Sequence, residues 1–418
     1  MLVTTTTTSL RARTRAMSHA GNLTEWVSAD NPLTFQRLGQ GFVGLGQALR
    51  LSFRGPQRFA DASAAWAEVV ASATIDDPLG LPGSGLICFG TFTFSDSSPE
   101  ESVLIVPQVV IGRHGSTSWR TDISVVGDSP TPSESKGSAP AEFAPLHWHS
   151  GLVSEDDFVA GVTAVINQVR DGVADKVVLA RDLIAHTPGL RDWRGAISRL
   201  TESYPDCQTF AIDGFVGSTP ETLARVERGR LGIRVLAGSI ARGSNPTDDR
   251  GKAQELITST KDNDEHRYAV NSVMDSLGTL TPHAVADEQP FAVKLANVWH
   301  LATDIEATLP DSVSSLDVVA ALHPSAAVAG SPTEVALDLI ASHEPFDRGR
   351  YAGPVGWMDA TGDGEWSVAL RCAQFSKDGT LTAYAGAGIV ADSDPESELL
   401  ETRLKFKPII QAFGTGAD

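Results

Sequence analysis

Cysteine is scarce in this sequence, with only Cys88, Cys207 and Cys372 among 418 residues. An odd number of thiols without paired spacing excludes a disulfide framework and a zinc site, and it is typical of a reducing compartment. No run approaches the roughly 20 apolar residues of a membrane helix, and the N-terminal segment lacks the apolar core of a secretory signal. We therefore expect a cytoplasmic protein that contacts no membrane.

Positive charge is also in short supply. Lys and Arg together number 33 against 52 Asp and Glu, so the formal net charge is −19. Nucleic-acid binding requires a basic surface that neutralises phosphates, and this balance excludes a nucleic-acid partner. An anionic small molecule can still bind, but only at a site that carries local cations or a metal ion.

Segments of biased composition divide the chain. The Thr-rich start predicts a disordered tail over 1–22, and the Ser-, Pro- and Gly-rich stretch 127–145 predicts a linker. Between them, 23–126 contains short apolar segments that predict strands and form the N-terminal half of the fold. The larger region 146–418 follows the linker and holds most of the helical patterns.

Helices and strands come in an irregular order in the C-terminal region. Ser154 and Asp157 form a capping box that opens an amphipathic helix ending at Gly172, and 175–186 is predicted to be a strand. Further helices are expected at about 247–278, 314–322, 333–342 and 395–413. Strands occur in runs, which favours an α+β fold with largely antiparallel sheet over a doubly wound fold.

The last helix carries chemically useful side chains, although the common nucleotide-binding and hydrolase motifs are absent. Asp394 is a predicted N-cap and Pro395 the first helical residue. Glu398, Glu401 and Lys405 then share one helix face. That face could hold Mg²⁺ and a substrate carboxylate, or it could be a solvated face with Glu–Lys pairs.

Four other residues have both a functional and a structural interpretation. Lys176 could extend to water from the end of its strand, or be enclosed and act as a base. Glu221 is expected to open a helix with Pro220, where it either complements the helix dipole or acts as an acid. Glu265 could begin a helix or bind metal, and His300 is by default a structural strand residue.

These residues, taken together, resemble the chorismate-utilising enzymes, a family of isochorismate, salicylate, anthranilate and aminodeoxychorismate synthases. The segments that carry the resemblance follow the family's order between 175 and 407: DKVVLARD, GSTPETL, LAGSIARG, DNDEHR, VWHLATDI, LHPSAAVAGSP, RGRYAGPVGW, SVALRCA and AGAGIVADSDPESELLETRLK. The resemblance implies one large α+β unit of two packed, mainly antiparallel sheets with outer helices. It also implies chorismate as the substrate and Mg²⁺ as the cofactor.

The resemblance further implies a role for each matching position. Lys176 would be the general base that activates water for attack at C2, and Glu221 the general acid that protonates the departing C4 oxygen. Glu265 and Glu401, with Glu398 close by, would hold Mg²⁺. The implied substrate-binding residues are His300, Thr303, Tyr351, Arg371, Gly386 and Lys405, together with backbone N–H groups near Gly388.

Two positions distinguish the branches of this family. Anthranilate synthases typically carry glutamine in place of Lys176, and aminodeoxychorismate synthases carry a nucleophilic lysine where this chain has Ala237. The likeness therefore implies a water-using isochorismate synthase of menaquinone or siderophore type, without a glutamine amidotransferase subunit. A salicylate synthase, which then eliminates pyruvate, and a non-catalytic chorismate-binding subunit are the alternatives. The segment HPSAAVAG departs from the frequent HPTPAVGG.

Overall fold

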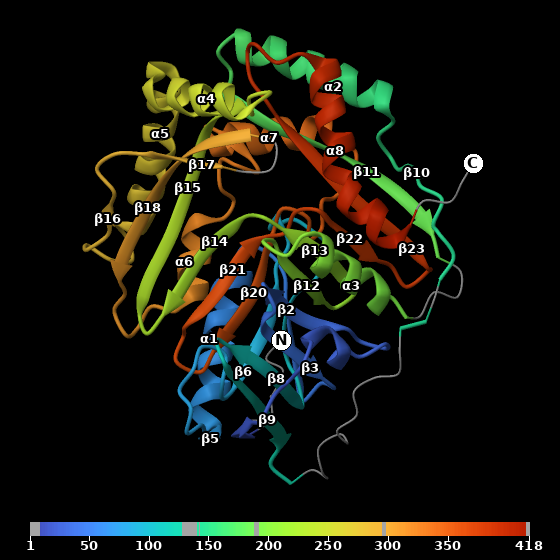
Figure 1. Cartoon of the computed structure of the whole chain (residues 1–418), viewed down its shortest axis with the longest axis vertical. Helices are drawn as coiled ribbons and strands as arrows, with labels where there is room; N and C mark the ends of the chain where they lie inside the picture. The colour runs from blue at the N-terminus through green and yellow to red at the C-terminus, as the bar shows by residue number, and fades with distance from the viewer. Residues whose placement is uncertain (1–8, 128–139, 142, 188–191, 295–297, 415–418) are drawn as a thin grey trace. The chain divides into compact units, whose positions relative to one another are not determined.

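The computed structural model describes all residues except 1–8, 128–139, 142, 188–191, 295–297 and 415–418 (Figure 1). Contacts divide the chain into two compact units. Unit 1 consists of Met1–Glu221, His323–Ala360 and Trp366–Asp418, and unit 2 consists of Thr222–Leu322 and Thr361–Glu365.

Unit 1 contains a thirteen-stranded sheet, in which the described strands pair in antiparallel fashion except for the parallel pair of β1 with β5. Its strands in spatial order are β10 (His149–Ser150), β11 (Lys176–His186), β23 (Thr380–Ile389), β22 (Cys372–Phe375), β13 (Phe215–Thr219), β12 (Gln208–Ile212), β2 (Leu33–Arg37), β3 (Gln40–Leu45), β8 (Val109–His114), β9 (Thr117–Val125), β1 (Leu10–Met17) and β5 (Thr74–Asp76), with β19 (Gly330–Ser331) paired to β11.

The long pair β11–β23 is the part of this sheet that matters most for the site. Its register runs from Val177 opposite Ile389 to His186 opposite Thr380. Within it, Val178 lies opposite Gly388 and Ala180 opposite Gly386. Because side chains alternate along a strand, residues 176, 178 and 180 share one face of β11.

The helices of unit 1 each bury an apolar stripe. They are η1 (Leu23–Trp26), α1 (Arg58–Ser72), α2 (Glu155–Arg170), α3 (Arg194–Ser203), α7 (Thr333–His343) and α8 (Pro395–Phe413). In α2 the capping box of Ser154 and Asp157 is present. Phe406 of α8 joins one buried cluster with Ala185 and Ala385, which shows that α8 covers one face of the β11–β23 pair.

Unit 1 also holds a second set of strands in the order β20 (Pro354–Asp359), β6 (Ile87–Thr91), β7 (Ser102–Val106) and β4 (Leu49–Phe53). Every residue of β20, β6 and β7 is buried, as expected for strands covered on both faces. The chain passes from unit 2 into unit 1 within β21 (Gly364–Val368).

Unit 2 is a smaller layer of strands with helices. Its strands follow the order β16 (Val285–Ala286), β18 (Val298–Thr308), β15 (Arg230–Ala241) and β14 (Thr222–Glu227), with β17 (Phe291–Lys294) paired to β18, and its helices are α4 (Pro246–Thr258), α5 (Thr260–Leu277) and α6 (Ser315–Leu322). Gly238 adopts a φ of 74° at a bulge in β15, a left-handed conformation that favours glycine.

The fold class is confirmed, since the described residues form two mainly antiparallel sheets with helices. Two expectations about these elements are wrong in detail, and two helices were not expected. Residues 10–17 form β1 within the expected disordered tail, because their alternate side chains are buried against the sheet. The helix expected at 247–278 is two helices that meet at Ser259, which caps α5 through its side chain. Helices α1 and α3 have no counterpart among the expected elements.

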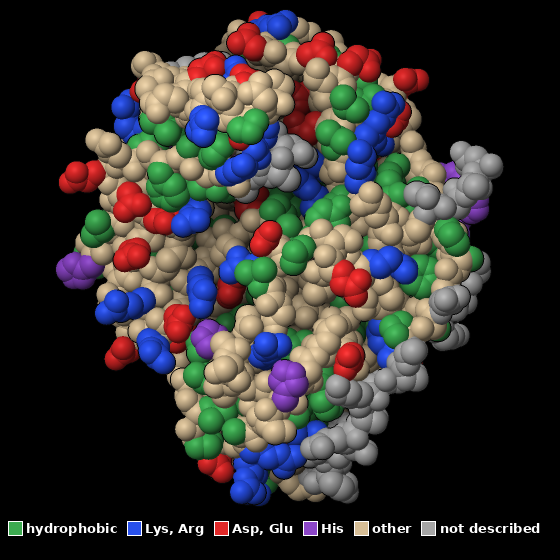
Figure 2. Space-filling model, in the orientation of Figure 1, with side chains coloured by type: hydrophobic (Ala, Val, Ile, Leu, Met, Phe, Trp, Pro, Cys, Tyr) green, Lys and Arg blue, Asp and Glu red, His purple; other side chains and the backbone are tan. Residues whose placement is uncertain are grey.

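The expected linker at 127–145 falls largely outside the described residues, so its character stays a prediction. The two compact units also divide the chain at other places than the expected boundaries. No helix in the described ranges is long and apolar enough to cross a membrane. Figure 2 shows acidic and basic side chains interspersed over the face that it presents.

Candidate functional site

Lys176, the first residue of β11, lies across the end of β23. A Cβ atom added to Gly388 would stand 2.8 Å from Cε of Lys176 and 3.5 Å from its Nζ. Glycine at position 388 therefore leaves the space that the lysine side chain occupies. Lys176 is half-buried at this position.

Gly386 is a second point at which side chains with expected substrate-binding roles meet. A Cβ atom there would stand 3.1 Å from the hydroxyl of Tyr351, and the ammonium of Lys405 donates a hydrogen bond of 2.9 Å to the Gly386 carbonyl. Strand β22 begins at Cys372, opposite Tyr384, so β23 continues past it. The structure thus brings Lys176, Tyr351 and Lys405 to one short stretch of β23.

Lys405 is held between a main-chain carbonyl and a carboxylate. Its ammonium forms an ion pair with Glu401, one helical turn earlier in α8. Burial lowers the pKa of Lys405, although Glu401 and Glu398 act in the opposite direction. The helix itself begins as predicted, with Asp394 as side-chain N-cap and Pro395 in the first turn.

Glu398 and Glu401 place two carboxylates on one side of α8. Burial raises the pKa of Glu398, and the neighbouring charge of Glu401 raises it further. This concentration of negative charge suits a hard divalent cation. Among the described side chains, no group of three His, Cys, Asp or Glu could hold a metal ion; the third expected ligand, Glu265, lies in α5, and its side chain is outside the described part of the chain.

Glu221 lies in the short connection between β13 and β14, so the helix expected at this position is wrong. Its N–H donates to Oγ1 of Thr219 at 3.2 Å, and its carbonyl accepts from the Val368 N–H at 3.0 Å. The chain then continues as a strand in which Leu223 and Val226 are buried. Strand pairing therefore overrides the local Pro–Glu signal for a helix start.

The Glu221 carboxyl is surrounded by positive charge. Burial raises its pKa, while the charges of Arg371, Lys176 and Lys405 oppose that rise. The net direction is upward, so desolvation outweighs three cations at this position. The expected acid, the expected base and two expected carboxylate-binding residues thus belong to a single electrostatic neighbourhood within unit 1.

Arg371 has a backbone conformation that is uncommon for its residue type. Its φ is 49°, in the left-handed region, and its carbonyl accepts the Ser218 N–H at 3.2 Å. Such conformations cost energy and cluster at functional sites. Ala352, which follows Tyr351, also has a positive φ of 61°.

A buried ion pair lies beside Tyr351, whose ring centre is 5.8 Å from Cζ of Arg348. Nε and Nη2 of Arg348 donate to the Glu344 carboxylate at 2.8 and 2.6 Å, and the two side chains are only 2% and 3% exposed. Arg348 also donates to the Val178 carbonyl at 2.7 Å, and Glu344 accepts the Ala180 N–H at 2.8 Å. The pair thus occupies the edge of β11 between β19 and β10, where a neighbouring strand would otherwise bond.

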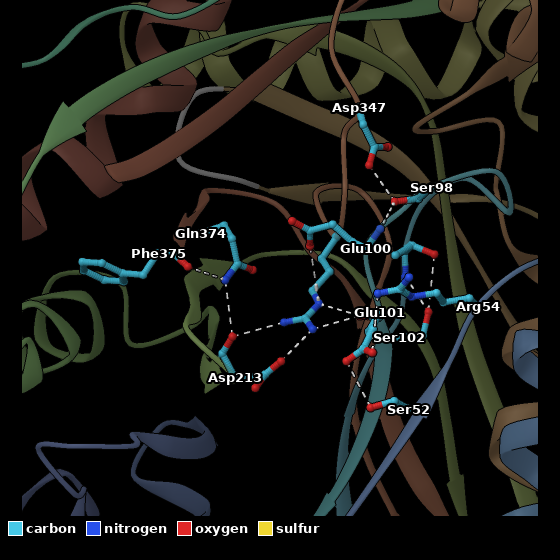
Figure 3. A network of polar contacts seen from close by, with 12 residues as sticks. Ser52, Arg54, Ser98, Glu100, Glu101, Ser102, Asp213, Asp347, Gln374 and Phe375 are labelled. Atoms are coloured by element: carbon cyan, nitrogen blue, oxygen red, sulfur yellow. Dashed lines mark hydrogen bonds and ion pairs between the residues drawn. The ribbon is translucent and has the colours of Figure 1, made fainter. Parts of the chain in front are cut away.

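A second network fixes the segment that leads to Tyr351 (Figure 3). Nη2 of Arg350 donates to Oδ2 of Asp213 at 2.7 Å and, together with Nε, to the Glu101 carbonyl at 2.9 and 3.0 Å. Ser98 donates to Asp347 at 2.6 Å. Sequence reasoning missed these supports; the two arginines of RGRY were the available signal, since arginine is chosen where a rigid multiple donor is needed.

The remaining expected residues lie in unit 2. His300 and Thr303 are in β18, opposite Ser239 and Val235 of β15. His266, next to Glu265 in α5, has Nε2 2.7 Å from Oγ1 of Thr303 and Nδ1 3.1 Å from the Ala237 carbonyl, and it is buried. His266 therefore ties the helix that carries Glu265 to both strands.

Comparison with known proteins gives a consistent result. Residues 32–414 match the family described as chorismate binding enzyme. Isochorismate synthase DhbC of Bacillus subtilis is 37% identical over 308 residues, which are 68% of this chain and 76% of the relative. The salicylate biosynthesis isochorismate synthase of Pseudomonas aeruginosa is 31% identical over 93% of this chain and 86% of its own length.

A solved structure supports the same assignment. The crystal structure of DhbC from Bacillus anthracis has a TM-score of 0.73 at 28% sequence identity, and the match covers 94% of this chain and 99% of that one. The similarity therefore extends over the whole fold and is not confined to the motifs near the site. On this basis the chain belongs to the family of chorismate binding enzymes.

Proposed function

We propose that this chain is an isochorismate synthase that converts chorismate to isochorismate. The observation that carries the proposal is that the charge of the half-buried Lys176 acts on the Glu221 carboxyl, whose pKa is raised by burial. Several similar proteins are named isochorismate synthases, DhbC of Bacillus subtilis among them. Acid and base groups with different environments are what an isomerisation by water exchange requires.

In the proposed reaction, water adds at C2 of the ring and the hydroxyl at C4 leaves. Lys176 is the base in this proposal and takes a proton from the attacking water. Glu221 gives its proton to the departing oxygen, which leaves as water. The raised pKa of Glu221 favours the protonated form that this step needs. One water is consumed and one released, so the net change is an isomerisation.

Substrate binding is assigned to the cations and donors beside these two groups. Tyr351, Arg371 and Lys405, with N–H groups near Gly386 and Gly388, would hold the carboxylates of chorismate. Burial raises the pKa of Tyr351, which keeps its hydroxyl available as a donor. We propose that His300 and Thr303 of unit 2 serve the same substrate.

Magnesium is proposed as the cofactor. Glu401 and Glu265, with Glu398 nearby, would hold it, and the mutual repulsion of Glu398 and Glu401 fits a bound dication. When bound, Mg²⁺ would neutralise the ring carboxylate of the substrate. It would also stabilise the negative charge that develops in the conjugated ring during the reaction. It also explains how a protein of net charge −19 accepts a dianion.

Several finer assignments belong to this proposal. The chain would act without a glutamine amidotransferase subunit, because water and not ammonia is the nucleophile. Three free thiols suit a cytoplasmic location. The isochorismate formed could serve menaquinone, siderophore or salicylate synthesis.

The test is the product profile with chorismate, Mg²⁺ and no amine donor, separated by chromatography. Isochorismate as the product supports the proposal, and it should disappear on chelation and return when Mg²⁺ is added back. Accumulation of salicylate and pyruvate would identify a salicylate synthase. Chorismate binding without turnover would identify a non-catalytic chorismate-binding subunit. Lys176→Ala should lower the rate about 10²–10⁴-fold, the usual contribution of a general base.

A further inference from the structure

Arg181 is a buried charge in β11 that the proposed reaction does not use. Strand alternation places it on the face opposite Lys176, where α8 packs. Its side chain is 2% exposed, and Nε donates to Oγ1 of Thr402 at 2.8 Å. Its guanidinium carbon lies 4.9 Å from the centre of the Phe406 ring, and Nη2 is 3.3 Å from Oε1 of Glu155.

The strength of its ion pair does not explain this arginine. Burial lowers the pKa of Arg181, and its carboxylate partner Glu155 is shared with Arg403, which donates to both carboxylate oxygens. An apolar residue in place of an incompletely paired buried charge is often neutral or stabilising. Only a polar residue at position 181 can donate the hydrogen bond to Thr402.

Thr402 lies in the turn of α8 that carries the proposed metal ligands. It directly follows Glu401, and Glu398 and Lys405 are its neighbours one turn before and after. Its hydroxyl also donates to the Leu399 carbonyl at 2.7 Å, which fixes the lone pair that it presents to Arg181. The threonine is fully buried. A single bond therefore joins the strand that begins at Lys176 to the helix turn that carries the carboxylates.

We propose that Arg181 is a positioning residue that fixes the rotation and axial position of α8 on β11. It thereby sets the placement of Glu401 and Lys405 relative to Lys176. The assignment rests on the proposed function for the roles of those three residues. Small displacements of reacting groups are costly, because a shift of about 1 Å can lower a rate roughly 10²-fold.

The test compares Thr402→Val with Thr402→Ser. Valine has nearly the shape of threonine but leaves Arg181 Nε without its acceptor, whereas serine keeps the hydroxyl. Arg181→Met is less useful, because it can fail to fold. Arg403→Gln, which removes an exposed partner of Glu155, is the matched control for the surrounding charges.

Mg²⁺ affinity by titration calorimetry, kcat and KM for chorismate, and the unfolding temperature are measured for each variant. Thr402→Val should bind Mg²⁺ about 10–100-fold more weakly, the usual effect of losing a group behind a metal ligand, and kcat should fall as well. Thr402→Ser and Arg403→Gln should both match the wild type.

Equal Mg²⁺ affinity and kinetics in the valine and serine variants would overturn the proposal, even if the valine variant melted at a lower temperature. A wild type that binds Mg²⁺ but makes no isochorismate would contradict the proposed function alone, and the comparison of affinities would still decide the role of Arg181. For a wild type that binds no Mg²⁺, chorismate affinity measured in the same way decides it.

Discussion

The ammonium of Lys405 in α8 donates a 2.9 Å hydrogen bond to the carbonyl of Gly386 in β23, beyond the point where β22 ends its pairing. The same ammonium is paired with Glu401. One side chain thus links the helix that carries the proposed metal ligands to the strand against which Lys176 and Tyr351 lie. The close approach of Lys176 and Tyr351 to β23 depends on glycine at positions 388 and 386.

Gly388→Ala should inactivate the enzyme with little effect on folding. The added Cβ would stand 2.8 Å from Cε of Lys176, so the far end of a flexible side chain must move. We expect isochorismate formation to fall about 10²-fold or more, with an unfolding temperature close to that of the wild type. Gly161→Ala in α2 is the control, since its Cβ would make only an ordinary contact with Leu179 at 3.8 Å. Equal activity of the two variants would contradict this placement of Lys176.

Glu221→Gln should separate stability from activity. The pKa of Glu221 is raised in the folded state. The stability that its protonated carboxyl contributes is therefore fully present below about pH 4, the ordinary pKa of a glutamate in the unfolded chain. It is lost as the pH rises through the folded pKa. Glutamine stays neutral, so the variant should be more stable than the wild type at pH 8 and similar at pH 4. Its activity should fall about 10²–10⁴-fold.

The pH profile of the wild type checks the same assignment. Turnover should decline as the pH rises through the pKa of Glu221, because the proton donor is lost. Urea unfolding of both proteins at the two pH values measures the stability difference. A difference that is the same at pH 4 and pH 8 would show that Glu221 does not titrate across this range.

Glu344→Gln should destabilise the protein strongly. The change leaves the charge of Arg348 buried without its carboxylate, a loss that typically costs about 3–5 kcal/mol. Urea denaturation measures the free energy of unfolding. The control is Glu255→Gln in α4, whose ion pair with Lys252 has side chains 59% and 37% exposed; exposed pairs contribute about 0–1 kcal/mol. Similar losses in the two variants would show that the buried pair adds no special stability.

His323 should make the protein acid-sensitive. The ring is half-buried and lies 5.8 Å, between ring centres, from both Phe59 and Phe94, and its Nε2 is 2.9 Å from the Phe94 carbonyl oxygen. Burial lowers the pKa of His323 to about 4 from an ordinary 6.5. The unfolded chain therefore binds the extra proton between these values, and stability should decrease as the pH falls from about 6.5 to 4.

His323→Gln isolates this effect. The variant cannot take up that proton, so its free energy of unfolding should change less between pH 7 and pH 4.5 than that of the wild type. Urea unfolding at the two pH values gives both numbers. An equal pH dependence in the two proteins would assign the acid sensitivity to other groups.

Local signals were sufficient for much of the fold. The capping box of Ser154 and Asp157 and the helix that begins after Asp394 are found as predicted, and the strand predicted over 175–186 is found at Lys176–His186. Each depends on hydrogen bonds and side-chain spacing within a few residues, which the sequence displays directly. The same spacing placed Glu398, Glu401 and Lys405 on one side of a helix.

Long-range contacts decided the rest. Glu221 precedes a strand and not a helix because β14 pairs with β15, and residues 10–17 are ordered because β9 pairs along their whole length. Neither partner is visible near these residues in the sequence.

By itself, then, the sequence determined the α+β class and the family resemblance, and it named the side chains that are proposed to act chemically, because periodicity and motif order are local properties. Only the tertiary structure decided that Lys176 and Tyr351 lie against β23 at two glycine positions, Gly388 and Gly386. It also decided that the side chains of Glu344 and Arg348 form hydrogen bonds with the backbone edge of β11. Those arrangements depend on which strands pair, and strand pairing is settled by burial and hydrogen bonding between residues far apart in the chain.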